Sequence, residues 1–542
     1  MIIMKLLVRQ IEIALDYNQA MVVNAVASRL GGSTKDIKKC EIIRRSLDAR
    51  PWRNAPVYIL SAEVDYVGKL NMKRLPSNVE KLDMQHREAD FDYSKCKKLS
   101  TRPVVVGAGP AGLMAAIVLA RGGAKPILIE RGSKAEERHE TVDAFWQSGK
   151  LNLENNVLFG EGGAGLFSDG KLTARSKDRR RIRIFFEELV KAGANPEILI
   201  EAEPHLGSDT LLNIIPNLRN EIISNGGEIR YNTTVTEINI ENNKVVSVKA
   251  GDEIIKTDNL LLCTGHSARD VYRTLAALNA AMESKPIAVG IRLEVPQKQI
   301  NKSQFRKFAD NAKIGAASYK LTRKSEDGVR ACYTFCMCPG GQVIACANDE
   351  KGLTTNGMSL SKRNAKYGNA AFTVPVEPED YSTVENTEKY PVLAGISFQR
   401  DIEEKAFVAG GSDFTVPALK LKDFLNNKVS GNLPEGRSCP RSIPADFDKI
   451  LPKFVTDTLR HQIPHMLKEL NDVNPDDAVI YAAETRTSSP VRVLRDENGQ
   501  SPNIVGLYPV GEGAGYAGGI VSSAVDGMKT AEVILTDYKP AK

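Results

Sequence analysis

The middle of the chain alternates short, wholly apolar runs with glycine-rich turns and longer apolar segments. Residues 104–106 are three valines, residues 107–112 are rich in glycine, residues 113–121 are mostly apolar, and residues 126–130 form an apolar run that ends in an acid. Short apolar runs bounded by turns are typical of buried strands, and a longer apolar segment favours a buried helix. The pattern predicts a strand–turn–helix–strand unit at the start of the main body.

The same reasoning predicts the elements that follow this unit. Residues 209–225 carry apolar positions at helical spacing, and residues 260–263 form another buried strand, which ends in Thr264-Gly265. Three short segments between them predict an antiparallel meander over residues 235–240, 244–249 and 253–257. Near the C-terminus, a strand, a glycine-rich turn and a helix are expected over residues 505–510, 511–519 and 520–535.

Two other stretches have a different pattern. The first 95 residues predict a small βαββ unit, with its elements over residues 3–14, 18–30, 38–48 and 57–67, and a polar, lysine-rich linker follows it. A later stretch mixes short strands, polar loops and most of the cysteines. We therefore expect a small N-terminal α/β domain, a main domain in two parts, and an α+β substrate domain inserted between those parts. The boundaries that we assign are residues 1–95 for the N-terminal domain, 100–285 and 479–542 for the main domain, and 286–478 for the insertion.

Composition narrows the class of protein. The 542 residues are 42% hydrophobic and 26% charged, with a formal net charge of +6, which is typical of a globular protein and too weakly basic to argue for nucleic acid. The one dense basic run, residues 177–183, favours the solvated first turns of a helix over a phosphate-binding patch. We expect no secretory signal and no membrane span, because the N-terminal apolar run is short and broken by Lys5. The eight cysteines are then expected to be thiols in a reducing cytoplasm.

The first motif with chemical content is Gly107-x-Gly109-x-x-Gly112, placed between a predicted strand and a predicted helix. In such a motif the first glycine permits a tight turn, the second lets the backbone approach a pyrophosphate, and the third lets helix and strand pack closely. The free N–H groups of the helix N-terminus suit the phosphates. Glu130 ends the next strand, at the spacing of an acid that binds a ribose hydroxyl. The motif therefore predicts a dinucleotide without a 2′-phosphate.

Two later motifs change the expected dinucleotide from NAD to FAD. The strand that ends in Thr264-Gly265 follows the meander, whose first residue, Val235, is where such folds offer a backbone group to adenine. The third motif runs from Gly511-Glu512 to Gly519. Its acid would hold a ribityl hydroxyl, and its glycines would let the backbone pass close to a flavin ring. A helix from Ile520 would aim its positive end at the ring. NAD-binding folds need only the first motif, so we expect non-covalently bound FAD.

A fourth segment, residues 160–172, is a glycine-rich stretch that we interpret as a loop facing the flavin, with Lys171 near the ring or the pyrophosphate; a surface turn is the alternative. No second GxGxxG lies between a strand and a helix, so NAD(P)H is expected to dock, if it is used, without a domain of its own. The predicted FAD-binding residues are Gly107, Ala108, Gly109, Pro110, Ala111, Gly112, Glu130, Arg131, Gly162, Gly163, Ser168, Asp169, Lys171, Val235, Thr264, Gly265, Gly511, Glu512, Gly518, Gly519 and Ile520.

With these motifs in view, the chain resembles the uncharacterised bacterial FAD-dependent, or NAD(FAD)-utilising, dehydrogenases, which have a glutathione-reductase-like flavoprotein fold. The resemblance runs through essentially the whole chain and is strongest in the strings at residues 46–50, 163–172, 335–341, 355–359 and 486–492. It implies a discontinuous Rossmann-like FAD-binding domain of the two-dinucleotide type, with an inserted second domain. It supplies neither a substrate nor catalytic residues.

Candidate substrate residues come from the inserted region and the segment after it. If the strand around them is regular, Cys332, Thr334, Cys336 and Cys338 share one face, and Tyr333, Phe335 and Met337 share the other. The thiols are either small buried residues or redox-active groups near the flavin, and their spacing fits no metal site. Arg486, Arg492 and Arg292 could each bind a substrate carboxylate or form a structural salt bridge. Lys171 completes the weak catalytic candidates, namely Cys336, Cys338, Lys171, Arg486 and Arg292.

The expected function is that of an FAD-dependent oxidoreductase that moves hydride between a small-molecule substrate and flavin N5, in a cleft between the main and inserted domains. One alternative is a flavoprotein that modifies RNA, which salt-dependent tRNA binding would reveal. The other is a non-catalytic redox sensor, which a bound flavin that no reductant reduces would favour.

Overall fold

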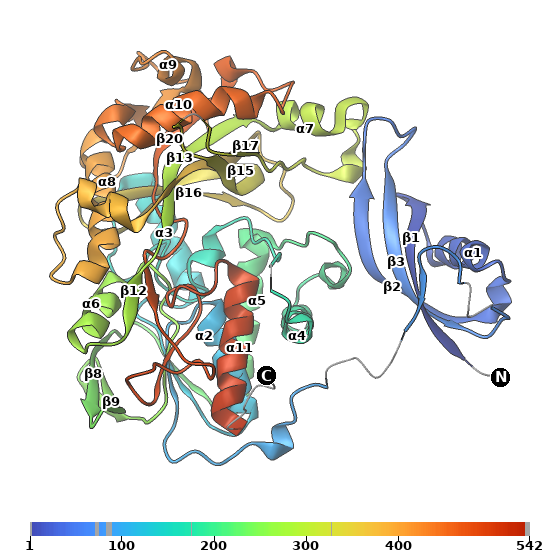
Figure 1. Ribbon diagram of the computed structural model, residues 1–542, viewed down its shortest axis with the longest axis horizontal. Helices are drawn as coiled ribbons and strands as arrows, with labels where there is room; N and C mark the ends of the chain where they lie inside the picture. The colour runs from blue at the N-terminus through green and yellow to red at the C-terminus, as the bar shows by residue number, and fades with distance from the viewer. Residues whose placement is uncertain (1–2, 71–74, 83–88, 175, 327, 537–542) are drawn as a thin grey trace.

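The computed structural model describes residues 3–70, 75–82, 89–174, 176–326 and 328–536 (Figure 1). Its centre is a five-stranded parallel sheet in the order β22-β11-β5-β6-β7. The strands are β5 (Val104–Val106), β6 (Ile127–Ile129), β7 (Glu228–Arg230), β11 (Leu260–Leu262) and β22 (Leu507–Pro509). β22 comes from near the C-terminus and pairs with β11, so the end of the chain completes a sheet that β5 begins.

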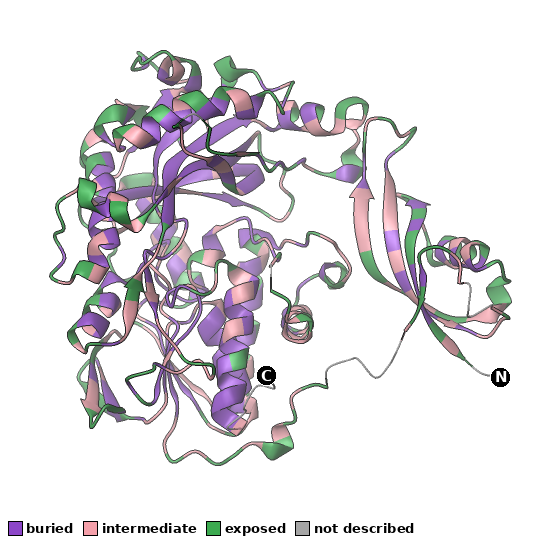
Figure 2. Ribbon diagram, viewed as in Figure 1, coloured by how far each residue is buried: buried purple, intermediate pink, exposed green. Residues whose placement is uncertain are grey.

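Helices cover one face of this sheet, and an antiparallel meander with a short helix covers the other, which explains why its three central strands are wholly apolar. α2 (Pro110–Arg121) and α11 (Ile520–Thr536) lie against each other so closely that a Cβ atom at Gly527 of α11 would fall 2.1 Å from the Ala111 carbonyl oxygen. α5 (Gly207–Ser224), α4 (Arg179–Lys191) and α3 (Ala135–Ser148) complete this layer. Figure 2 shows the sheet and the inner sides of α2 and α11 as buried. The predicted strands and helices of this region are confirmed, apart from shifts of a few residues at their ends.

The basic run at residues 177–183 is only partly exposed to solvent, although its sequence favoured the solvated first turns of a helix. It enters the first turn of α4, where Arg180 Nη2 lies 2.6 Å from Glu532 Oε2 of α11 and Arg181 pairs with the same carboxylate. Both arginine side chains are largely buried. Charge pairing between two helices therefore accounts for these two arginines, whereas Arg179 at the start of the same turn is exposed.

The predicted meander is also confirmed. β8 (Val235–Glu241), β9 (Lys244–Ala250) and β10 (Glu253–Lys256) form an antiparallel sheet in the order β10-β9-β8. Its apolar side chains pack against the parallel sheet, so that Ile238 and Val245 share a core with strands β5 and β11. The short helix α6 (Arg269–Ala277) follows β11, and β12 (Met282–Ser284) pairs with β21 (Val491–Val493) where the chain leaves and re-enters this part of the molecule.

The region between these crossings contains an eight-stranded sheet that lies above the parallel sheet in Figure 1. Its strands are β13 (Ile287–Pro296), β14 (Thr322–Arg323), β15 (Cys332–Asp349), β16 (Gly352–Ser359), β17 (Tyr367–Val376), β18 (Val416–Lys420), β19 (Ser442–Pro444) and β20 (Val479–Glu484). α7 (Gln297–Phe305), α8 (Ala394–Ala409), α9 (Leu421–Leu425) and α10 (Lys453–Leu467) surround it. β20 lies beyond the boundary that we placed at residue 478, yet it pairs with β13 and β18 inside this sheet.

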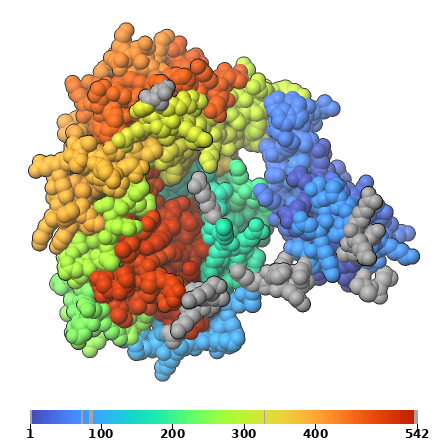
Figure 3. Space-filling view, viewed as in Figure 1, coloured from blue at the N-terminus to red at the C-terminus, as the bar shows by residue number. Residues whose placement is uncertain are grey.

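The N-terminal part of the chain forms a separate sheet in the order β2-β3-β1-β4, with one helix on one face. Its elements are β1 (Met4–Ala14), α1 (Gln19–Leu30), β2 (Ile37–Asp48), β3 (Val57–Tyr66) and β4 (Val79–Lys81). The predicted βαββ order is confirmed, and β4 is an additional edge strand. Arg45 joins this unit to the main body by pairing with Glu197 and Glu201. In Figure 3 the unit stands to one side of the main body. No helix among the described residues is long and apolar enough to cross a membrane.

Candidate functional site

One pocket gathers residues from all four sequence motifs. It opens where β5, β6 and β11 end and is bounded on its other side by the eight-stranded sheet. The predicted residues that line it are Gly107, Gly109, Pro110, Ala111, Glu130, Arg131, Gly163, Ser168, Asp169, Lys171, Val235, Thr264, Gly265, Cys336, Arg486, Glu512, Gly518, Gly519 and Ile520. The predicted residues outside its lining are Ala108, Gly112, Gly162, Gly511, Arg292 and Cys338. Segments far apart in the sequence are thus brought together around one space.

The glycine loop has the geometry that a bound pyrophosphate requires. Gly107 has a φ of 100°, and a Cβ atom there would lie 2.6 Å from the Cys263 carbonyl oxygen. A Cβ atom at Gly112 would lie 1.8 Å from the Gly107 carbonyl oxygen, so any side chain would force the turn and α2 apart. At Gly109, which lines the pocket, a Cβ atom would be in ordinary contact with the Gly163 Cα atom at 3.7 Å, so packing within the protein does not itself require glycine there. α2 begins at the next residue, so its unpaired N–H groups lie beside the pocket.

Glu130 lines the pocket and also accepts hydrogen bonds from the backbone around it. Its carboxylate accepts hydrogen bonds from the N–H groups of Ala108 at 2.7 Å and of Gly132 and Gly160 at 3.0 Å each. The glycine loop, the end of β6 and the start of the fourth motif are therefore held by one buried side chain. A carboxylate has about four acceptor positions, so one is left for a ribose hydroxyl, and that contact stays a prediction.

Arg138 of α3 is the most important residue that the sequence did not reveal. Its side chain is fully buried, and its guanidinium donates five hydrogen bonds to carbonyl oxygens of residues 156–163. Burial lowers the pKa of this guanidinium to about 10, although the nearby Glu130 and Glu161 oppose the shift. A Cβ atom at Gly160 would collide with the Arg138 side chain at 2.3 Å. The shape of the fourth motif thus depends on an arginine that no local pattern distinguishes from a surface residue.

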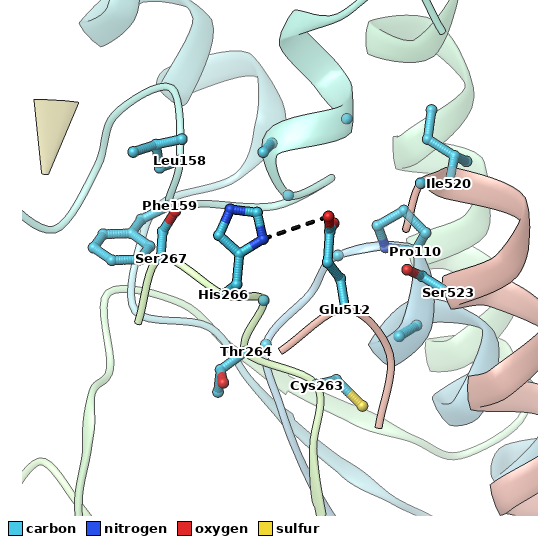
Figure 4. Close-up of a pocket in the computed structure, with 18 of the residues that line it drawn as sticks. Pro110, Leu158, Phe159, Cys263, Thr264, His266, Ser267, Glu512, Ile520 and Ser523 are labelled. Carbon is cyan, nitrogen blue, oxygen red and sulfur yellow. Dashed lines mark ion pairs between the residues drawn. The ribbon is translucent and has the colours of Figure 1, made fainter. Parts of the chain in front are cut away.

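The C-terminal motif reaches the pocket from the opposite side (Figure 4). Glu512 Oε1 lies 3.4 Å from His266 Nδ1, and both side chains face the pocket. The preceding turn is fixed by Asp526 of α11, which accepts from the Gly511 N–H group at 2.7 Å. α11 begins at Ile520, so a second helix N-terminus lies at the pocket wall. No catalytic or binding role was predicted for His266, and its pairing with Glu512 emerges only in the folded protein.

Lys171 links the fourth motif to the eight-stranded sheet. Its Nζ atom lies 2.9 Å from Asp169 Oδ2 and also donates to the Met337 carbonyl oxygen in β15. Burial acts to lower the pKa of Lys171, but the neighbouring Cys338 and Asp169 outweigh it and raise the pKa. Asp169 also pairs with Arg363, with Nε–Oδ1 at 2.9 Å. A charged network therefore joins the loop to the strand that carries the cysteines.

The regular strand that we expected around the cysteines is interrupted. Phe335 pairs with Ala371 and Cys338 pairs with Asn369, so three residue steps on β15 face two on β17. Such a β-bulge reverses which side chains face which side. Cys336, at the bulge, has a φ of 42°. The prediction that Cys336 and Cys338 share a face with Cys332 and Thr334 is therefore wrong, because a bulge breaks the alternation that it assumed.

Two of the arginine candidates have different environments. The fully buried Arg292 uses all five N–H donors within the protein, on Glu484, Asn369, Asn356 and the Cys336 carbonyl oxygen. It has no donor left for a substrate carboxylate, so the ligand-binding interpretation of Arg292 is wrong and the structural one is right. Arg486 lines the pocket and pairs with Glu403 through Nε and Nη2 at 2.9 and 2.8 Å. Its buried Nη1 has no hydrogen-bond partner within the described part of the chain.

Arg492, the third candidate, pairs with Glu283 at 2.7 Å on the β21–β12 pair and does not line the pocket. Among the residues that the structure describes, no cluster of three or more histidine, cysteine or acidic side chains is arranged to hold a metal ion.

Comparison with known families identifies the cofactor. Residues 100–141, which contain the glycine loop and Glu130, match an FAD binding domain. Residues 286–487 match the family described as FAD-dependent protein, C-terminal domain-like, and residues 4–65 match a domain of unknown function. The glycine loop lines the pocket, and two helix N-termini face the same pocket. FAD is the cofactor of this protein, and the prediction of a flavoprotein is confirmed.

Similar proteins match larger parts of the chain, and one of them matches nearly all of it. An uncharacterised protein of Clostridium beijerinckii is 40% identical over 99% of this chain and 99% of its own length. A probable electron transfer flavoprotein-quinone oxidoreductase of Escherichia coli, YdiS, is 27% identical over 36% of this chain and 44% of its own length. Among solved structures, glycine oxidase from Bacillus cereus has 13% identity and a TM-score of 0.31, covering 81% of this chain and 96% of its own. The chain thus belongs to the same protein family as the Clostridium beijerinckii protein, and it carries two regions that match FAD-dependent protein families.

Proposed function

We propose that the protein is an FAD-dependent oxidoreductase that transfers hydride between a small-molecule substrate and N5 of the flavin. The observation that carries this proposal is that two different parts of the fold form the pocket wall. One side comes from the nucleotide-binding loops, and the other comes from the eight-stranded sheet through Phe335, Cys336, Asn356, Glu484, Arg486 and Thr487. A pocket that only held a cofactor would need the first side alone. The second side offers a surface to a substrate.

The residues of the second side suit a small substrate with an apolar part and a polar part. Phe335 is 41% exposed although it lines the pocket, so it offers an apolar surface to a ligand. Arg486 is held at the pocket wall by Glu403, and its positive charge suits an anionic or carbonyl oxygen. FAD supplies the two-electron chemistry when it is bound. The protein's residues bind and orient the substrate and exclude water from it.

The finer architecture is part of this proposal. We propose a discontinuous FAD-binding domain of the two-dinucleotide, glutathione-reductase-like type, formed by residues 100–285 and 485–542, with residues 286–484 inserted, so that β20 belongs to the insertion, and residues 1–95 as a small separate domain. The pairing of β22 with β11 and the meander β8–β10 support this layout. We also propose that FAD is held without a covalent bond, by those of the predicted residues that line the pocket, in a cytoplasmic protein. NAD(P)H would act on it without a nicotinamide domain.

The test is an absorbance spectrum of the purified protein, followed by anaerobic titration. The expected result is a flavin spectrum that dithionite bleaches and an artificial electron acceptor restores. NADH and NADPH are then added separately, and bleaching by either one identifies the electron donor. If neither acts, the electrons come from the substrate itself. A bound flavin that dithionite cannot reduce, or a protein that takes up no FAD, would overturn the proposal.

A further inference from the structure

We propose that Cys336 and Cys338 form a redox-active dithiol that exchanges two electrons with the bound flavin and serves a thiol or disulfide substrate. The inference rests on the proposed function and names the substrate class for the same pocket. Three independent features carry it: the position of Cys336, the bulge in the strand that holds the two cysteines, and the cations around them.

Cys336 lies on the pocket wall, and Cys338 lies directly behind it. Cys336 lines the pocket, whereas Cys338 is fully buried and does not. Lys171 donates to the carbonyl oxygen of Met337, the residue between them. The loop that carries Lys171 also touches the start of α11, since a Cβ atom at Gly165 would lie 3.0 Å from Ile520. The cysteines are therefore connected to the part of the pocket where the flavin ring is expected.

The bulge places the Cys338 thiol against the backbone of Cys336. In a regular strand, Cα atoms two residues apart are separated by about 6.6 Å, at the upper end of the range for a disulfide. The left-handed conformation of Cys336 bends the chain between them. The Cys338 thiol accordingly lies 3.3 Å from the Cys336 carbonyl oxygen. A disulfide across one intervening residue closes a small, strained ring, and strained disulfides are the readily reduced ones.

Cations and polar groups surround the pair. A Cβ atom at Gly357 would lie 2.5 Å from Arg292 Nη1 and 2.9 Å from Cys338 Sγ, so the guanidinium and the thiol border the same small space. The neighbouring Cys338 thiol and the charges of Arg292 and Lys171 lower the pKa of Cys336, against the effect of burial. The pKa of Cys338 is raised. Cys336 is then the attacking thiolate and Cys338 its protonated partner.

The dithiol and FAD can exchange two electrons with each other without a further reactant. When an S–S bond forms between Cys336 and Cys338, the two thiols lose two electrons and two protons, and oxidised FAD accepts both electrons. In reverse, reduced FAD supplies two electrons, two protons are taken up, and the S–S bond breaks. Exchange of the dithiol with a substrate disulfide moves the same two electrons outward, and leaves the Cys336–Cys338 bond and two substrate thiols.

The experiment counts electrons and thiols in the FAD-loaded protein. After oxidation with ferricyanide, which is then removed, anaerobic dithionite titration should consume about four electron equivalents per FAD in the wild type, two for each two-electron couple. Cys336→Ser and Cys338→Ser should consume about two. Cys346→Ala is the matched control, because this thiol is buried in the same strand and burial raises its pKa to about 12; it should behave like the wild type.

A second readout needs no variant. The protein has eight cysteines, and alkylation after denaturation should trap all eight in the reduced sample and two fewer in the oxidised one. Peptide mapping should place the missing pair at residues 336 and 338. Consumption of about two equivalents by the wild type, with eight thiols trapped after oxidation, would overturn the dithiol while leaving the flavin chemistry intact. A protein that binds no FAD would instead refute the proposed function, and its thiol count would still be measurable.

Discussion

The dependence of the flavin pocket on Arg138 can be tested by replacing this residue with lysine. The wild-type guanidinium donates to the carbonyl oxygens of Asn156, Val157, Gly160, Glu161 and Gly163, at 2.8 to 3.2 Å. The Gly160 and Gly163 carbonyls also accept from the N–H groups of Gly163 and Leu166, so within the described part of the chain the carbonyls that depend on Arg138 are those of Asn156, Val157 and Glu161. Their bonds come from three different nitrogens, and one ammonium nitrogen cannot take all three positions, so Arg138→Lys leaves at least one of these carbonyls without a partner. The variant keeps the positive charge, so the measurement isolates the geometry of the hydrogen bonds.

The expected cost follows from the number of carbonyls that lose a donor. A buried polar group left without a partner costs about 1–3 kcal/mol, so one such carbonyl gives about 2 kcal/mol in the middle of the range. Three of the five acceptors, Gly160, Glu161 and Gly163, belong to the segment that reaches the pocket, so this cost falls on the FAD-bound conformation. Since 1.4 kcal/mol corresponds to a tenfold change in affinity, FAD binding should weaken roughly thirtyfold.

The assay is titration of the apoprotein with FAD, followed by the change in flavin fluorescence. Thermal unfolding of the apoprotein, measured separately, reports how much of the effect is global. Arg179→Lys is the matched control, because Arg179 is an exposed arginine on α4, and its FAD affinity should equal that of the wild type. An Arg138→Lys protein that binds FAD within about threefold of the wild type would refute the argument that these hydrogen bonds shape the pocket.

Three further predictions concern other parts of the structure. Gly112→Ala should abolish FAD retention, measured by an absorbance spectrum, because the new Cβ atom would lie 1.8 Å from a carbonyl oxygen. The control Gly431→Ala, where no atom lies within 4 Å of the new Cβ atom, should retain FAD. Equal retention by both variants would contradict the packing argument. Burial acts to raise the pKa of Glu403, but two buried arginines lower it to about 2, so its contribution to stability is full above pH 4.5 and is lost as the pH falls towards 2. Glu403→Gln should therefore flatten acid unfolding in that window and cost about 3–5 kcal/mol at pH 7 in denaturant melts, and an unchanged acid limb would count against it. Alkylation of Cys336 by iodoacetamide should have a midpoint below the ordinary thiol pKa of about 8.5, and a midpoint at or above that value would mean that the pKa of its thiol is not lowered.

Local patterns were sufficient for the elements of the parallel sheet. The runs at 104–106 and 260–262 are wholly apolar because helices and the meander bury both faces of their strands, and this burial is visible in the sequence itself. The glycines at 107 and 112 could also be interpreted early, since only glycine tolerates the close approach of a turn to a strand or a helix. The sequence therefore determined the order of the elements, the glycine loop and the identity of the cofactor.

Other features depended on contacts between distant residues. The bulge at Cys336 arises from the register of β15 against β17, and the strand's own residues look regular. The five bonds of Arg138 and the saturation of Arg292 depend on which carbonyl and amide groups the fold brings to each buried guanidinium. A sequence records the charge of an arginine but not whether its partner will be a ligand, a carboxylate or a backbone carbonyl. That choice is made by burial, because a buried charge is stable only where the tertiary structure supplies its partners.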